Sequence, residues 1–177
     1  MTRVNVVDPL LLTDQHLHAE CREINHVFSY VERYYTPKKV FNIAADYTLN
    51  TGHVQFFADK LKFIYNRKLR LEQERFMRNV IRGKYGVGKD VDATWDDSFD
   101  AELWQQRYDA FPQHLKNDYI PTANAIHVNV ERIVERIMDK PTWYRYLGKC
   151  NVLVTPEDIQ TVYNKNNPSF YSTGITQ

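Results

Sequence analysis

The chain has 177 residues, of which 43% are hydrophobic and 25% charged, and its net charge is +1. This balance predicts one soluble globular domain, and no apolar run is long enough to predict a membrane span or a secretory signal. Two cysteines, Cys21 and Cys150, are too few for a disulfide framework, so we expect a reducing compartment.

The charge is unevenly distributed along the chain. Of the 23 basic and 22 acidic residues, one basic and seven acidic residues lie in 90–110, which leaves 22 against 15, or +7, elsewhere. Such an asymmetry is typical of a surface that binds a polyanion. The alternative is that the opposite charges are spread evenly over the fold and form no patch.

A stretch near the N-terminus predicts an amphipathic helix over residues 14–35, capped by Thr13 or Asp14. Two glutamates, Glu20 and Glu23, lie on the border between its apolar and polar faces. Partial desolvation at a border raises a carboxyl pKa and suits an acid/base group, although solvated edge glutamates are the alternative. The face predicted to contact the core consists of Leu17, Cys21, Ile24, Val27, Phe28, Val31 and Tyr35.

Two further helices are predicted over about residues 53–82 and 122–138, from apolar residues with helical spacing. A shorter helix is expected near 100–109, because the aromatic residues of the acidic segment favour packing. The 53–82 helix is strongly basic, and we interpret most of its cations as a solvated face. These cations are Lys60, Lys62, Arg67, Lys68, Arg70, Arg75 and Arg78.

The C-terminal third alternates between aromatic and polar sequence. Residues 142–149 interleave three aromatic side chains with two cations, which are the ingredients of a nucleic-acid contact or of a packing segment. Residues 150–177 predict a loosely docked extension. Together these features predict an all-α fold: one compact domain over residues 1–149 with three main helices, long loops and an acidic insertion at 84–112.

Short sequence blocks occur in a fixed order along the chain. They include Met-Thr-Arg at 1–3, Asp-Gln-His-Leu at 14–17, Arg-Glu at 22–23, Gly-His-Val at 52–54, Asp-Tyr-Ile-Pro at 118–121 and Pro-Thr-Trp-Tyr at 141–144. Each block is weak alone. Together, over residues 1–83 and 113–149, the chain resembles the pyrimidine-dimer DNA glycosylases of T-even phages, their endonuclease V family.

The resemblance implies an enzyme that binds cyclobutane pyrimidine dimers in duplex DNA, cleaves the N-glycosidic bond and nicks the abasic site. The nucleophile would be the α-amine of Thr2 after removal of Met1, and Glu23 would be essential. The base opposite the lesion would be extruded into a protein pocket. UV-damaged double-stranded DNA would be the partner of a monomer in a bacterial host's cytoplasm, with no metal, cofactor or membrane required.

The residue types suit this chemistry on their own grounds. An α-amine has an ordinary pKa of about 7.7–8.0, so it is partly neutral near pH 7 and can form an imine with the sugar. Arg3 and Arg22 would favour the neutral amine. Glu23 can stabilise the cationic sugar and shuttle protons. The catalytic residues predicted are therefore Thr2, Arg22 and Glu23.

Residues that would contact DNA follow from the resemblance position by position. Arg3, Arg22, Arg132 and Arg136 match positions that grip the backbone, and Gln15 matches a residue beside the lesion. Each phosphate contact should steepen the salt dependence of binding. The predicted DNA-binding residues are Arg3, Gln15, Arg22, His26, Arg33, Arg132, Arg136, Trp143, Tyr144, Arg145 and Tyr146.

The chain departs from the family at two places. Asn25-His26 replaces a Pro-Arg pair, so a permanent charge is lost at a backbone-contact position. We expect DNA binding to tighten from pH 8 to pH 6 through His26. The acidic insertion at 84–112 either packs away from the DNA or mimics it.

Three other functions remain open from the sequence. A DNA-binding protein could keep the same scaffold without catalysis, and a helical bundle could be purely structural. A metal hydrolase would use His16, His18, Glu20 and Glu23, although His18 lies on another helical face.

Overall fold

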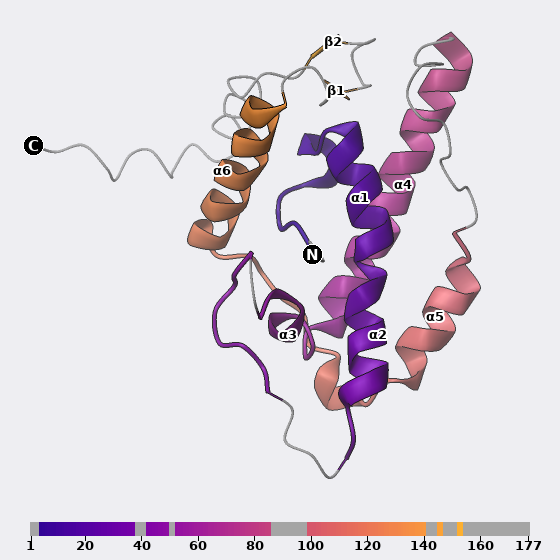
Figure 1. Cartoon of the computed structure of the whole chain (residues 1–177). Coiled ribbons are helices and arrows are strands. Elements are labelled where there is room, and N and C mark those ends of the chain that lie inside the picture. The colour runs from indigo at the N-terminus through magenta and orange to yellow at the C-terminus, as the bar shows by residue number, and fades with distance from the viewer. Residues whose placement is uncertain are drawn as a thin grey trace, which may run out of the picture.

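The computed structural model describes residues 4–37, 42–49, 52–85, 99–140, 145–146 and 152–153. Apart from one short strand pair, the fold is all-α, as predicted (Figure 1). In chain order the elements are η1 (Pro9–Leu11), α1 (Asp14–Glu23), α2 (Asn25–Tyr34), α3 (His53–Phe56), α4 (Leu61–Tyr85), α5 (Ala101–Ala110), η2 (Gln113–Leu115), α6 (Ala123–Asp139), β1 (Arg145–Tyr146) and β2 (Val152–Leu153).

The predicted helix over 14–35 is two helices, α1 and α2, which stack end to end in Figure 1. Thr13 caps α1 through its side chain, which accepts a hydrogen bond from the His16 N–H. At the junction the Val27 N–H donates to the Ile24 carbonyl at 3.1 Å, a tighter three-residue turn. Ile24 nevertheless keeps helical dihedrals, so one polar face continues through both helices. The junction precedes Asn25, where the resembling family has proline.

The predicted helix over 53–82 is also interrupted, because α3 ends at Phe56 and α4 begins at Leu61. Between them the backbone bonds to another part of the chain. Lys60 forms a β-bridge with Lys116, and the Asn117 N–H donates to the Asp59 carbonyl at 3.2 Å. Hydrogen bonds to this distant segment replace those that a continuous helix would make.

The predicted core face of α1 and α2 is confirmed, since Leu17, Ile24 and Phe28 have no exposed surface. Phe28 stacks on Trp104 of α5 with ring centroids 3.9 Å apart. Figure 1 shows α5 and α6 on opposite sides of the α1–α2 rod, with α4 running beside it. The short helix expected near 100–109 is therefore present as α5, and it packs on the core.

The interpretation of the α4 cations as a solvated face is wrong for four of them. Lys62 and Arg70 are exposed, as expected, and Lys60, which precedes α4, is half-buried and paired with Asp59. The other four, Arg67, Lys68, Arg75 and Arg78, are between 2% and 7% exposed. Each buried cation is paired with a carboxylate: Arg67 with Glu20, Lys68 and Arg75 with Glu72, and Arg78 with Asp14 and Glu74. Burial of a charge requires such a partner, and the period of the apolar residues alone does not reveal it.

Two further observations concern the ends of the described chain. Within the described ranges, α-helices long and apolar enough to cross a bilayer are absent. The strands β1 and β2 pair antiparallel, with Arg145 opposite Leu153 and Tyr146 opposite Val152, so part of the predicted extension meets the aromatic segment. The remainder of the extension lies outside the described residues, and the division into a 1–149 domain and a tail stays a prediction.

Candidate active site and DNA-binding face

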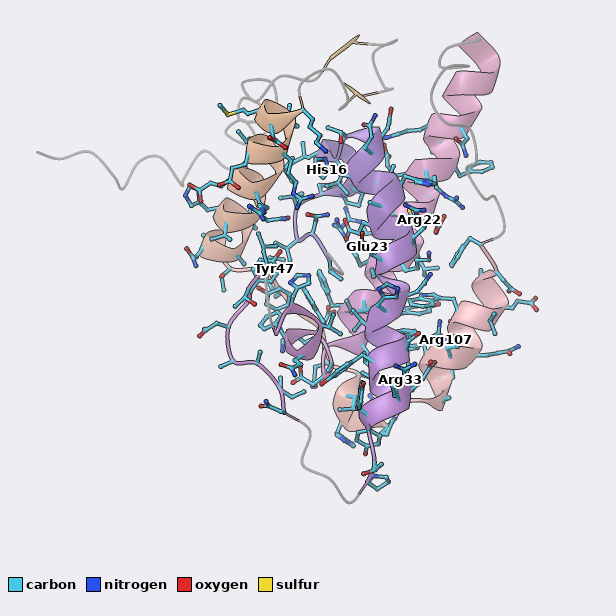
Figure 2. The ribbon with its side chains drawn as sticks, in the orientation of Figure 1. His16, Arg22, Glu23, Arg33, Tyr47 and Arg107 are labelled. Atoms are coloured by element: carbon cyan, nitrogen blue, oxygen red, sulfur yellow. The ribbon has the colours of Figure 1, made fainter. Side chains whose placement is uncertain are left out.

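Glu23 and Arg22 lie next to each other at the C-terminal end of α1 (Figure 2). Glu23 is half-buried, whereas Arg22 is exposed. Burial raises the pKa of the Glu23 carboxyl, and the charges of His26 and Arg22 act in the opposite direction. A carboxyl of raised pKa is a better proton donor than an ordinary glutamate and can still accept a proton when ionised.

Glu20, the other candidate acid/base group, has a structural role instead. Its side chain is 1% exposed and accepts hydrogen bonds from Arg67 Nε at 2.9 Å and Arg67 Nη2 at 3.0 Å. It also accepts from the backbone N–H of Asn5 at 3.0 Å and from Asn5 Nδ2 at 2.7 Å. These partners satisfy both carboxylate oxygens, so Glu20 joins α1, α4 and the N-terminal segment.

Residues 4–7, which we call the anchored segment, are buried and have no helical structure. Side chains accept from all four of their backbone N–H groups. His53 Nε2 accepts from Val4 at 2.7 Å, Glu20 accepts from Asn5, and Asn129 Oδ1 accepts from the next two residues at 2.9 and 3.3 Å. Buried backbone groups of an irregular segment need such partners. The sequence analysis missed this segment, because side-chain acceptors leave no period.

A cavity of about 490 Å³ lies between α1, α4 and α5. Its walls hold four basic side chains against two acidic ones, so it carries an excess of positive charge. Two aromatic rings from the described part of the acidic insertion complete one wall. The lining residues are His18, Cys21, Arg22, Asn25, Lys68, Glu72, Arg75, Phe99, Asp100, Leu103, Trp104 and Arg107.

Several predicted DNA-binding residues follow the polar face of α1 and α2. Arg22, His26 and Arg33 are exposed, and Gln15 is half-buried. Figure 2 shows Arg33 on α2, beyond Arg22 and Glu23 along the same rod. The cations predicted to grip DNA are therefore presented along one continuous helical face.

The cations of α6 lie near the beginning of this face. Arg132 is exposed and Arg136 is half-buried, and both border a small depression together with His16 and Asn5. Arg132 Nη1 also pairs with Glu135 at 2.8 Å. The fold thus brings α6, the anchored segment and the start of α1 together.

The remaining predicted site residues are placed only in part. The backbone of Arg145 and Tyr146 forms β1, which lies beside α1. Thr2, Arg3, Trp143 and Tyr144 lie outside the described residues. Their roles stay predictions from the sequence.

The residues that the structure describes do not support the metal-hydrolase alternative. His16 is buried, and its Nδ1 bonds to Thr13 Oγ1 at 2.7 Å; burial lowers its pKa to about 4. Glu20 is occupied by Arg67. Over the described ranges, His, Cys, Asp and Glu form no group of three that could hold a metal ion. The buried Cys21 thiol, with its pKa raised by desolvation, is a core group.

Residues 1–85 match the family model of pyrimidine dimer DNA glycosylases. Over these residues, just under half of the chain, the match supports the resemblance to that glycosylase family. The matched residues include the anchored segment, Glu23, Arg22 and α4, so the resemblance is confirmed there. At the family level the match supports a role in DNA repair, with DNA as the substrate that such a family implies. The blocks at 118–121 and 141–144 lie beyond the match.

Proposed function

We propose that the protein cleaves the N-glycosidic bond at cyclobutane pyrimidine dimers in duplex DNA with the Thr2 α-amine, and then nicks the abasic site. The observation that carries this proposal is the half-buried Glu23, with its raised pKa, beside the exposed Arg22. Glu23 follows Glu20 by three residues, so both side chains lie on one side of α1. Glu20 holds Asn5, and the segment leading to Thr2 therefore runs along that same side.

The proposed reaction begins with attack of the Thr2 nitrogen on the anomeric carbon C1′. The C1′–base bond breaks, and the base leaves with the bonding electrons and takes up a proton that the attacking amine releases. Opening of the sugar ring breaks the C1′–O4′ bond and leaves an iminium at C1′. Glu23, in its protonated form, gives O4′ its proton, which the raised pKa favours.

Strand cleavage then uses the carboxylate that the first stage leaves. The iminium draws electrons from C2′, so the Glu23 carboxylate can remove a C2′ proton. The electrons of that C–H bond form a new double bond, and the C3′–O bond breaks with its electrons on the departing phosphate. Water later hydrolyses the imine and frees the amine.

The cavity beside Arg22 is suited to hold the extruded base. Its volume of about 490 Å³ falls within the range of small-molecule sites. The half-buried Phe99 offers a ring for stacking, and the exposed Arg22 on its wall can attract the DNA backbone. Because α5 supplies one wall, we infer that the acidic insertion serves the binding site and does not mimic DNA.

Borohydride trapping tests the proposal directly. Purified protein is mixed with a duplex that carries one thymine dimer, or one abasic site, and borohydride is added. We expect a covalent protein–DNA band from the wild type with both duplexes. A glycine inserted between Met1 and Thr2 should abolish the band, since it moves the terminal amine.

Two glutamate variants sharpen this experiment. Glu23→Gln should lower trapping on the dimer duplex by at least about a hundredfold, because it removes the proton-shuttling carboxyl. Glu102→Gln, on the exposed face of α5, is the matched control and should trap like the wild type. DNA binding without a band from the wild type would refute catalysis and support the non-catalytic DNA-binding protein.

A further inference from the structure

We propose that His53 is a positioning residue that sets where the terminal amine attacks, with Tyr47 and Asn129 acting beside it. This inference rests on the proposed function, because it concerns the amine that the proposed reaction uses. His53 itself takes no part in the chemistry. His53 begins α3, far from Glu23 in sequence, and is 2% exposed. His53 acts on the reaction indirectly, through its hydrogen bond to the backbone of the anchored segment.

The hydrogen bonds of the His53 ring define its tautomer. Nδ1 bonds to the backbone carbonyl of Thr48, which can only accept, so Nδ1 carries the proton. Nε2 therefore presents its lone pair, and it accepts from the Val4 N–H at 2.7 Å. Burial lowers the pKa of His53, which keeps this acceptor unprotonated at neutral pH. A protonated ring would place two N–H groups against each other.

The hydrogen bond from the Val4 N–H to His53 constrains the backbone that precedes Val4 in the chain. The peptide unit is planar, so the hydrogen bond to His53 fixes the orientation of the whole plane that joins Val4 to the previous residue. Two peptide units separate Val4 from the amine of Thr2. An error of about 1 Å in the position of a reacting group can lower a rate by about a hundredfold. The His53 acceptor therefore affects the approach of the nucleophile.

The other face of the anchored segment is held by different elements. The Tyr47 hydroxyl donates to the Val4 carbonyl at 3.3 Å, and the Tyr47 ring meets the His53 ring edge-on at 5.5 Å. Figure 2 shows Tyr47 in the connection that precedes α3. Asn129 of α6 accepts from Val6 and donates to Asn5 Oδ1 at 2.7 Å. The connection before α3, α3 itself, α4 through Arg67 and α6 thus all hold the segment, and His53 bonds to the backbone group nearest to the amine along the chain.

A pair of substitutions separates the two nitrogens of the ring. Asparagine places its amide near Nδ1 and can still donate to Thr48, but it does not reach Val4. Glutamine is longer and places its amide oxygen near Nε2, where it can accept from the Val4 N–H. We therefore compare His53→Asn and His53→Gln, with His127→Asn on α6, whose side chain is 44% exposed, as the histidine control.

The measurements are the single-turnover rate of trapping on an abasic duplex and the Kd for a duplex with an uncleavable tetrahydrofuran site. We expect His53→Asn to slow trapping at least tenfold with its Kd within twofold of the wild type. His53→Gln should recover to within about threefold of the wild-type rate, and His127→Asn should match it.

Each other result overturns the inference. A wild-type rate in His53→Asn would show that the acceptor is irrelevant, and equal losses in both His53 variants with weakened DNA binding would show a merely structural role. If His53→Asn does not fold, Tyr47→Phe replaces it, with a slower rate at unchanged Kd expected and an unchanged rate as refutation. A wild type that traps neither duplex refutes the proposed function first.

Discussion

The basic residues of α4 and those of the α1–α2 face have the same charge and opposite environments. Arg67 and Arg78 are 4% and 2% exposed, and each is bonded to a carboxylate of α1. Arg22, His26 and Arg33 are exposed along the polar face. Water is excluded from Arg67 and Arg78, so their charges are taken up by ion pairs inside the protein. The second group remains available to a polyanion.

This difference shows that an excess of basic residues in a sequence does not by itself indicate a binding surface. The buried cations of α4 hold α1 and the segment before it, as Arg78 does by donating to the carbonyls of Pro9 and Leu12. Arg67 likewise donates to the Val7 carbonyl. The charge that can meet DNA is therefore smaller than the composition indicates, and it is concentrated on α1, α2 and α6.

The largest effect is expected from breaking a buried pair. Glu20→Ala would leave Arg67 buried without its carboxylate, which should lower the free energy of unfolding by about 3–5 kcal/mol. Glu131→Ala removes the exposed partner of His127 and should change it by less than about 0.5 kcal/mol. Urea unfolding at pH 7 measures both. A loss below about 1 kcal/mol for Glu20→Ala would contradict the assignment.

Acid should destabilise the protein through His16. Its folded-state pKa is lowered from the ordinary 6.5 to about 4, so between these values the unfolded chain binds a proton that the folded protein does not. Stability therefore falls as the pH drops from 6.5 to 4, by up to about 3 kcal/mol. His16→Gln should flatten that part of the profile, whereas the control variant His127→Gln, at a half-buried surface position, should keep it. Urea unfolding across pH 4–7 is the measurement, and parallel profiles would refute the prediction.

The exposed cations should control the salt dependence of DNA binding. Arg33→Ala is expected to lower the slope of log Kd against log salt by about 0.9, the contribution of one phosphate contact. Arg70→Ala is the matched control, because Arg70 is exposed on α4 and pairs with Asp8 at 2.7 Å. Its slope should equal that of the wild type. Equal slopes for the wild type and the two variants would show that the DNA does not contact Arg33.

The smallest effect concerns His26, where the family carries arginine. Histidine is the side chain type that ordinarily gains charge between pH 8 and pH 6, and His26 lies on the exposed face. Binding should therefore tighten by about two- to fivefold, as one solvent-exposed charge pair allows. His26→Ala should lose this increment, and His26→Arg should bind at pH 8 as the wild type does at pH 6. Fluorescence anisotropy with labelled duplex measures it, and an unchanged profile in His26→Ala would exclude the residue.

Local sequence patterns predicted the parts of the fold that depend on local spacing. The bounds of α6, the presence of α5 and the core face of α1 and α2 were all visible as periodic apolar residues. The interruption at residues 57–60 was not, because its backbone bonds to Lys116 and Asn117, nearly 60 positions away. One signal for the buried cations was present: Lys68–Glu72, Glu72–Arg75 and Glu74–Arg78 have helical pair spacing.

The candidate site shows the same division. Glu23 and Arg22 could be chosen from their helical positions, and Glu23 is indeed half-buried. Glu20 has an equivalent border position, yet Arg67 and Asn5 occupy it completely. Only the tertiary partners distinguish the two glutamates, and one partner lies 47 positions away in sequence.

The anchored segment also constrains the order in which the protein assembles. Residues 4–7 leave the ribosome before any of their partners, since His53 follows Val4 by 49 positions and Asn129 follows Val6 by 123. Contacts of such separation form late, because closing a long loop loses chain entropy before the contact is gained. During synthesis the anchored segment is therefore made first, and all of its hydrogen bonds are in place only after α6 has folded against it.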